Sequence, residues 1–313
     1  MPTLIRFLHC TLFLAVFSLL STHAAVAEPS PQGRFFVMGS GVLHLKNLRN
    51  NREAKVNLLN QNGSFNEEAF NKVDWVFDYP TEEKGEHISP RLLFMLSYFV
   101  DRLAPGKTVN IESAYRSPEY NNQIREQGNN AALTSTHQDG MALDFWLPGV
   151  AGKRLWQTIK AKKCCGIGHY GGKIVHLDAG KPRFWEAATS GTRSKEPDYN
   201  RHLYLSTDFD RYKPKDRIRL SFSSLSNYDF GVHPVAQLFR ADDLQNPVSG
   251  IRIDFKGEID CLRIGDRKAS RFLTASLPAY IPPGTYTVKM EFCEKPFDQM
   301  PSEAFSNPIE LRP

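Results

Sequence analysis

Residues 135–144 read STHQDGMALD, in which His137 and Asp144 stand seven positions apart on either side of Asp139-Gly140. If Asp139-Gly140 is a two-residue hairpin turn, side-chain alternation places the imidazole and the carboxylate on one face, roughly 7 Å apart at the backbone. A straight strand would separate them by about 23 Å. The turn therefore predicts that both side chains can reach a single metal ion.

A second histidine lies in KIVHLDAG, residues 173–180. His176 is in an apolar run, where an imidazole without a partner is costly to bury. Asp178 follows two residues later, on the same face of the predicted strand. Two histidines and one aspartate form a ligand set typical of catalytic zinc, with a fourth position open to water. We therefore expect His137, Asp144 and His176 to bind Zn²⁺.

Three ordered motifs, SAYRSPEYN (113–121), STHQDGMALDF (135–145) and GIGHYGGKIVHLDAG (166–180), resemble those of the M15 zinc peptidases. The resemblance covers roughly residues 42–186 and is greatest to a secreted branch related to murein endopeptidases and D-Ala-D-Ala carboxypeptidases. The family pattern S-x-H-x6-D with a later histidine matches Ser135, His137, Asp144 and His176. The resemblance implies a zinc-dependent hydrolase of peptidoglycan stem peptides or cross-links.

The resemblance also suggests catalytic residues. Arg116, in the matching Y-R-S tripeptide, would bind a substrate carboxylate or stabilise the oxyanion. Many family members carry an acid, the general base, where this chain has Lys173, and a charged lysine cannot accept a proton. Asp178 is then either the base or the carboxylate that holds a ligand histidine. His169 is a candidate donor to the transition state.

Lys173 keeps a second hypothesis open, in which the protein binds the cell wall without catalysis and the zinc is structural. A different metalloenzyme on a similar scaffold, such as an amidase, would share the ligands. The sequence leaves open which peptide bond is cut.

The 313-residue chain has room for about two domains at roughly 100–200 residues each. Arg6, the apolar run 8–20 and AAVA (24–27) have the pattern of a cleavable signal peptide. We expect a signal peptide over 1–27, a zinc peptidase domain over 28–186, a linker over 187–200 and a β-sandwich domain over 201–313.

The fold class that we predict is α+β. The first domain combines alternating strand patterns, such as ALDFWL (142–147), with helices that begin at Ser64, Ser89 and Pro118. Ser64 and Glu67 have the spacing of a capping box. These elements predict a small antiparallel sheet with helices that carries the zinc site. Beyond residue 200 about seven short alternating runs predict an all-β, immunoglobulin-like sandwich.

Composition narrows the location and partners. Export predicts a periplasmic or secreted protein, with no membrane association once the signal is removed. The net charge of +5 suits an anionic wall, and no basic cluster with interleaved aromatics suggests nucleic acid. Cys261 and Cys293 lie in strand-like runs and could form a disulfide in an oxidising compartment. The remaining histidines, such as His87 and His202, carry no ligand pattern, and His87 is expected at the surface.

Overall fold

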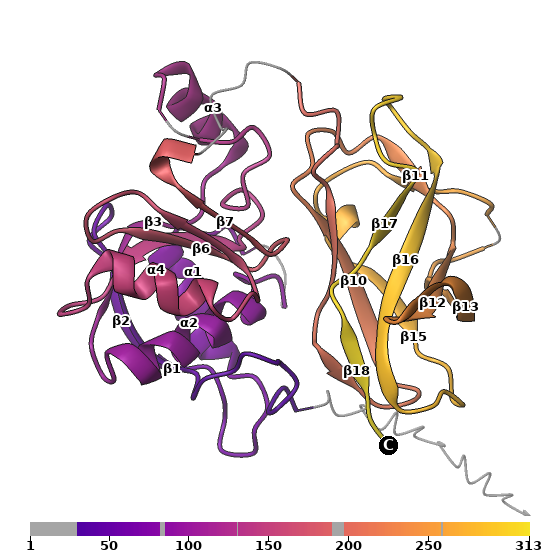
Figure 1. Cartoon of the computed structure of the whole chain (residues 1–313), viewed down its shortest axis with the longest axis horizontal. Coiled ribbons are helices and arrows are strands. Elements are labelled where there is room, and N and C mark those ends of the chain that lie inside the picture. Colours follow the sequence, from indigo (N-terminus) through magenta and orange to yellow (C-terminus); the bar gives the residue numbers. More distant parts are fainter. Residues whose placement is uncertain (1–29, 82–84, 130, 190–196, 258) are drawn as a thin grey trace, which may run out of the picture.

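The structure is a computed structural model that describes residues 30–81, 85–129, 131–189, 197–257 and 259–313. The predicted signal peptide and half of the predicted linker, residues 190–196, lie outside these residues. Within them, no helix is long and apolar enough to cross a membrane. The chain is a mixed α+β protein, with its helices in the N-terminal part and strands dominating the C-terminal part (Figure 1).

A seven-stranded sheet organises the N-terminal part, in the order β2-β1-β3-β4-β6-β5-β7. Its strands are β1 (Val42–Asn47), β2 (Glu53–Asn57), β3 (Val109–Ser113), β4 (Ala142–Trp146), β5 (Gly166–His169), β6 (Val175–Asp178) and β7 (Arg183–Glu186). The prediction of a small antiparallel sheet is wrong, because β1 pairs with β3 and β5 with β7 in parallel. Two helices connect β1–β2 to β3, and a long crossover of this kind is what allows parallel pairing.

Among the described residues, four α-helices belong to the N-terminal part, and Figure 1 shows them beside this sheet. They are α1 (Glu67–Phe77), α2 (Pro90–Leu103), α3 (Pro118–Glu126) and α4 (Gly152–Lys160). Ser89 and Ser117 cap α2 and α3 with their hydroxyls, and proline occupies the first turn of each as expected. The capping box at Ser64 is wrong: Asn66 caps α1 by accepting a hydrogen bond from the Ala69 amide at 3.2 Å. The hydroxyl of Ser64 is instead bonded within its own loop.

The surface position expected for His87 is also wrong. Its side chain is only 6% exposed. Nδ1 lies 2.6 Å from Asp74 and Nε2 lies 3.0 Å from Glu67. Carboxylates accept hydrogen bonds, so both ring nitrogens carry protons and His87 is an imidazolium that ties α1 to the loop before α2.

The C-terminal part is built from a three-stranded sheet, β15-β10-β8, and an eight-stranded sheet that centres on β16. Its strands are β8 (Tyr204–Thr207), β9 (Arg211–Tyr212), β10 (Arg217–Ser223), β11 (Phe230–Val232), β12 (Val235–Arg240), β13 (Asp243–Arg252), β14 (Leu262–Ile264), β15 (Leu273–Ser276), β16 (Gly284–Glu294), β17 (Glu303–Phe305) and β18 (Ile309–Leu311). Alternate residues of β10 and β16 are buried, which gives this part an apolar core. The predicted disulfide between Cys261 and Cys293 is confirmed, and Cys164 and Cys165 are free thiols.

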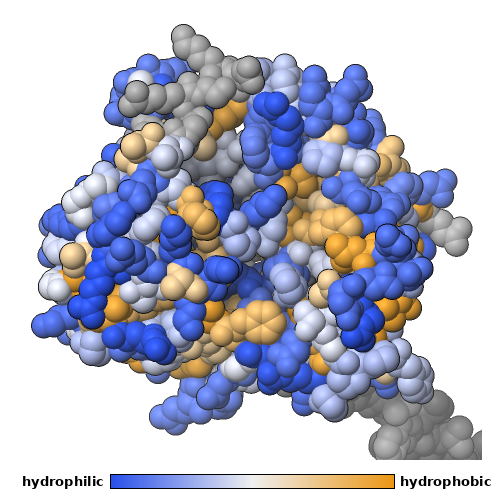
Figure 2. Space-filling model, viewed as in Figure 1, coloured by the Kyte–Doolittle hydropathy of each residue, from blue (hydrophilic) through white to orange (hydrophobic). Residues whose placement is uncertain are grey.

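The two parts are in direct contact. Arg91 of α2 forms an ion pair with Asp210 and donates a hydrogen bond to the Thr207 carbonyl at 2.9 Å. Figure 2 views the molecule as in Figure 1, and hydrophilic residues are interspersed with apolar ones over the face that it shows.

Candidate metal centre

The register of β4 against β6 brings together two of the expected ligands. Asp144 pairs directly with His176, and Ala142 pairs with Asp178. Since side chains alternate across a sheet, these four residues share one face. The opposite face of β6 carries Val175 and Leu177, which belong to the apolar core.

His137 reaches the same place from a loop and not from a strand. Residues 136–140 form consecutive turns, closed by a hydrogen bond from the Met141 amide to the Thr136 carbonyl at 3.1 Å. The two-residue hairpin at Asp139-Gly140 is therefore wrong. The reason is that β4 takes both its neighbours, β3 and β6, from other segments of the chain. The turns nevertheless direct the imidazole toward Asp144.

The three side chains converge in a buried position. Nε2 of His137 lies 3.2 Å from Nδ1 of His176 and 3.5 Å from Oδ1 of Asp144. Nδ1 of His176 lies 3.0 Å from the same Oδ1. All three residues are at most 6% exposed. Each of the three side chains thus directs one nitrogen or oxygen atom toward the same point, where there is room for a single ion.

The outer contacts of the two imidazoles decide what this space can hold. Nδ1 of His137 lies 2.6 Å from the Ala114 carbonyl, and Nε2 of His176 lies 2.7 Å from Oδ2 of Asp178. Both partners only accept, so each of these nitrogens carries a proton. In the neutral rings the remaining nitrogens have lone pairs that face each other and a carboxylate oxygen. A shared cation satisfies three converging lone pairs, so the residues fit a metal ion.

The electrostatics agree with a cation site. Burial, strengthened by the Arg116 charge, lowers the pKa of His137 and favours the neutral ring. Burial opposes ionisation of Asp144, but the contacts with His137 and His176 outweigh it and hold the pKa of Asp144 well below its usual range. Burial also disfavours charge on His176, yet the hydrogen bonds to Asp144 and Asp178 raise its pKa overall. A metal would therefore compete with a proton at His176.

Asp178 lies behind His176, on the far side from Asp144. It is fully buried, and its Oδ1 accepts hydrogen bonds from the Gly180 amide at 2.9 Å and from Arg183 at 3.0 Å. Gly166 and Gly168 of the stretch GIGH (166–169) leave the space that Asp178 and Trp185 occupy. A Cβ on Gly166 would lie 2.2 Å from Oδ2 of Asp178, and one on Gly168 would lie 2.4 Å from the Trp185 ring, which packs beside His176.

Comparison with known proteins shows which family the sequence around this site resembles. The family model "Peptidoglycan L,D-endopeptidase MepK", of the M15 peptidases, matches residues 38–185. The matched residues 38–185, here called the M15 domain, are thus similar to this family. Curated proteins named peptidoglycan L,D-endopeptidase MepK, from Escherichia coli K12, Escherichia coli O157:H7 and Shigella flexneri, are each 28% identical over 169 residues. That alignment covers 54% of this chain and 88% of each relative.

Two polar residues of the M15 domain contact Asp144 from the cleft side. Arg116 donates to Oδ2 of Asp144 at 2.9 Å and to the Ser113 hydroxyl at 2.9 Å. The Tyr170 hydroxyl donates to Oδ1 at 3.2 Å. Sequence reasoning missed both Tyr170 and Arg183, although Tyr170 stands in the matched GHYGG motif. Burial, followed by the charge of Asp144, raises the pKa of Tyr170, so its phenol stays protonated at neutral pH.

Two other candidates lie away from the three ligands. His169 pairs with Val175 and so faces the opposite side of the sheet from His176, where its ring packs near Trp156 of α4. We therefore withdraw the transition-state role for His169. Lys173 places its ammonium 3.6 Å from the centre of the Trp146 ring.

A cleft of about 530 Å³ opens at the candidate metal centre and extends to the C-terminal part. His137, His176, Arg116 and Tyr170 lie in its wall. The M15 domain adds further cations to the wall, namely Arg125, Lys181 and Arg183. The C-terminal part contributes Asp198, Arg201, His202, Leu203 and Ser224. His202 thus lies in the cleft wall, where its Nδ1 contacts Asp198, although no ligand pattern in the sequence marks it.

Proposed function

We propose that this protein is an exported, periplasmic zinc peptidase that hydrolyses peptide bonds in peptidoglycan stem peptides or cross-links. The observation that carries the proposal is the convergence of His137, Asp144 and His176 at the wall of the cleft of an M15 domain. Since the relatives are named L,D-endopeptidases, we propose that the bond cut joins an L- and a D-configured centre.

The mechanism assigns His137, Asp144 and His176 to hold the zinc. Zinc bound there would supply Lewis acidity, of the kind that polarises carbonyl groups and lowers the pKa of a bound water toward about 7. Asp178 keeps the proton on Nε2 of His176, and the Ala114 carbonyl keeps the proton on Nδ1 of His137. Both contacts hold the lone pairs toward the zinc.

Of the two roles left open for Asp178, we propose the holding role. Both its oxygens are engaged by His176, Gly180 and Arg183, so neither is available to take a proton from water in the cleft. Arg116 fixes the orientation of Asp144 and also borders the cleft, where its remaining donors can bind a substrate carboxylate. Tyr170, which stays protonated, donates its single hydroxyl hydrogen to Asp144 and so helps Arg116 to orient this carboxylate at the wall of the cleft.

The charge of the cleft supports an acidic peptide as substrate. Arg125, Lys181, Arg183 and Arg116 border it, and among the described residues of its wall Asp198 is the one carboxylate. Arg116 and Arg183 are paired with Asp144 and Asp178, and Asp198 with His202, so the charges of Arg125 and Lys181 carry most of this argument. Stem peptides carry free carboxylates, which such a wall attracts. We further propose that residues 28–186 and 201–313 are separate domains and that the second is an immunoglobulin-like sandwich.

A non-catalytic wall-binding protein with a structural zinc site is the second candidate. Lys173 favours it, because it replaces the usual acid and its ammonium packs on Trp146. Digestion of purified muropeptides, with product masses measured, separates the two. We expect cleavage that stops on chelation and in His137→Ala, and that persists in His233→Ala, which removes an exposed histidine of the C-terminal part. Zinc binding without cleavage by the wild type would instead support the wall-binding protein.

A further inference from the structure

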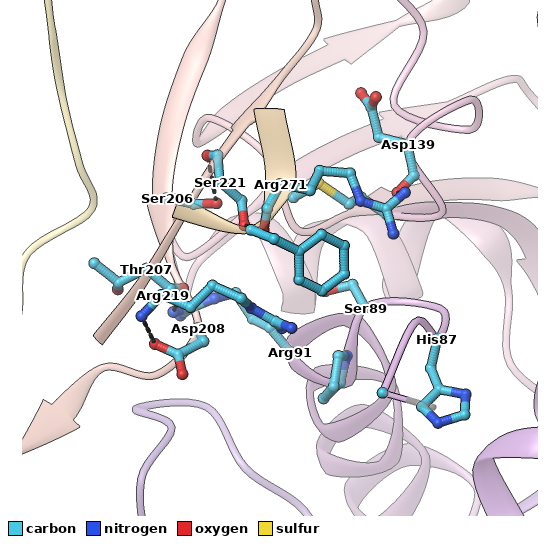
Figure 3. A pocket seen from close by; sticks show the side chains of 14 residues that line it. His87, Ser89, Arg91, Asp139, Ser206, Thr207, Asp208, Arg219, Ser221 and Arg271 are labelled. Carbon is cyan, nitrogen blue, oxygen red and sulfur yellow. Dashed lines mark hydrogen bonds between the residues drawn. The ribbon is translucent and has the colours of Figure 1, made fainter. Parts of the chain in front are cut away.

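The loop that carries His137 is in contact with the C-terminal part of the chain. Asp139 lies two residues after His137, and its side chain is 2% exposed. Arg267 forms an ion pair with Oδ1 of Asp139, and the Ser224 amide donates to Oδ2 at 3.0 Å. Arg271, in the short helix η2 (Ala269–Arg271), donates to the Asp139 carbonyl at 3.5 Å. Figure 3 shows Arg271 and Asp139 facing each other across the contact between the two parts.

The contacts from Arg267 and Ser224 compensate the buried negative charge of Asp139. A buried carboxylate without a partner is strongly destabilising. In the part of the chain that the structure describes, both partners of the Asp139 carboxylate come from beyond residue 200, outside the M15 match at 38–185. The M15 domain therefore carries a buried charge beside its metal ligand that the C-terminal part neutralises.

The opposite side of the loop is held by the M15 domain itself. The Ser89 amide donates to the Gly140 carbonyl at 2.9 Å, and the Arg116 amide donates to the His137 carbonyl at 3.3 Å. Gly140 has a φ of +64°, and a Cβ there would lie 2.7 Å from the Tyr79 ring. The Tyr79 hydroxyl in turn accepts a hydrogen bond from Arg271. The loop is thus fixed between two walls, one of which belongs to the C-terminal part.

Ser224 connects this contact to the substrate cleft. It borders the cleft, and its φ of +57° is a left-handed conformation that is uncommon for a residue other than glycine. The backbone bend at Ser224 directs its amide at Asp139. The segment that contacts the His137 loop therefore also forms part of the cleft wall, as Leu203 does.

We propose that Asp139 is a positioning residue, through which Arg267 and Ser224 of the C-terminal part hold the His137 loop in its metal-binding conformation. The C-terminal strands are then part of the catalytic unit and not only an attachment module. This inference rests on the proposed metal centre at His137 and concerns what keeps that centre assembled.

The test compares zinc affinity, measured by competition with a chromophoric chelator, in the full chain. Outer contacts of metal ligands typically contribute 10–100-fold in affinity. Asp139 holds the backbone that carries His137 and not the imidazole itself, so we expect a loss of about 10-fold, at the lower end of that range, in Asp139→Asn and in Arg267→Gln. The double variant should lose no more than either single variant, since both remove one interaction. The double variant also leaves neither Asp139 nor Arg267 as a charge without its partner. Its result therefore separates a loss of metal binding from a general failure to fold. Arg267→Lys, which keeps the charge, should recover much of the affinity.

The matched control is Arg263→Gln, which breaks the exposed ion pair with Asp229 in the same part of the chain and should leave zinc affinity unchanged. A second readout is amide hydrogen exchange of residues 136–140 in the metal-free protein, which should accelerate in Asp139→Asn. Unchanged affinity, or unchanged exchange of this loop, would overturn the inference. A wild type that binds zinc but cuts no peptidoglycan would contradict the proposed function alone.

Discussion

Replacing Asp178 by asparagine tests whether this carboxylate holds His176. Its Oδ2 accepts from Nε2 of His176 at 2.7 Å, and its Oδ1 accepts from the Gly180 amide and from Arg183. Asparagine offers only one accepting oxygen, so in either orientation its NH₂ group faces a buried donor. One donor then loses its acceptor, at a cost of about 1–3 kcal/mol.

We expect this loss to appear as weaker metal binding. If the NH₂ group faces His176, the ring must move its proton to Nδ1, the atom that points at the metal. Outer-contact losses of 10–100-fold correspond to about 1.4–2.7 kcal/mol, in agreement with the cost of the lost acceptor. Chelator competition measures the zinc affinity, with the exposed Asp229→Asn as the acid-to-amide control. A correctly folded Asp178→Asn protein with wild-type zinc affinity would refute the holding role.

Two further predictions concern stability. Gly166→Ala should lower the free energy of unfolding by about 1–3 kcal/mol through overpacking, because the new methyl group meets the Asp178 carboxylate; an unchanged denaturation midpoint would contradict this. Burial lowers the pKa of His87, but its hydrogen bonds to Asp74 and Glu67 outweigh that effect and raise it. The contribution of the charged His87 to the free energy of unfolding is therefore fully present below about pH 6.5. It is lost as the pH rises through the higher pKa of the folded state. In urea titrations, His87→Asn should therefore destabilise the protein more at pH 6 than at pH 9. An equal loss at both values would show that the imidazolium contributes nothing.

The sequence by itself determined the elements with strong local signals. The apolar stripe of α2, its Ser89-Pro90 start and the strand pattern of ALDFWL each depend on residues a few positions apart, and the structure contains them. The identity of the three residues that converge was also readable, since a histidine in the apolar run IVHLD needs a partner. The spacing of His137 and Asp144 alone predicted the wrong backbone path between them. A two-residue hairpin is the simplest connection between two strands, but the chain does not form one at Asp139-Gly140.

Only the tertiary structure decided how the site is supported. The pairing of β4 with β6 sets Asp144 beside His176, and the packing of β5 leaves room for Asp178 only because Gly166 lacks a side chain. The contacts of Asp139 with Ser224 and Arg267 join residues 85 or more positions apart. Such contacts leave no periodic trace in the sequence, because each depends on how separate elements pack and not on the local preferences of either partner.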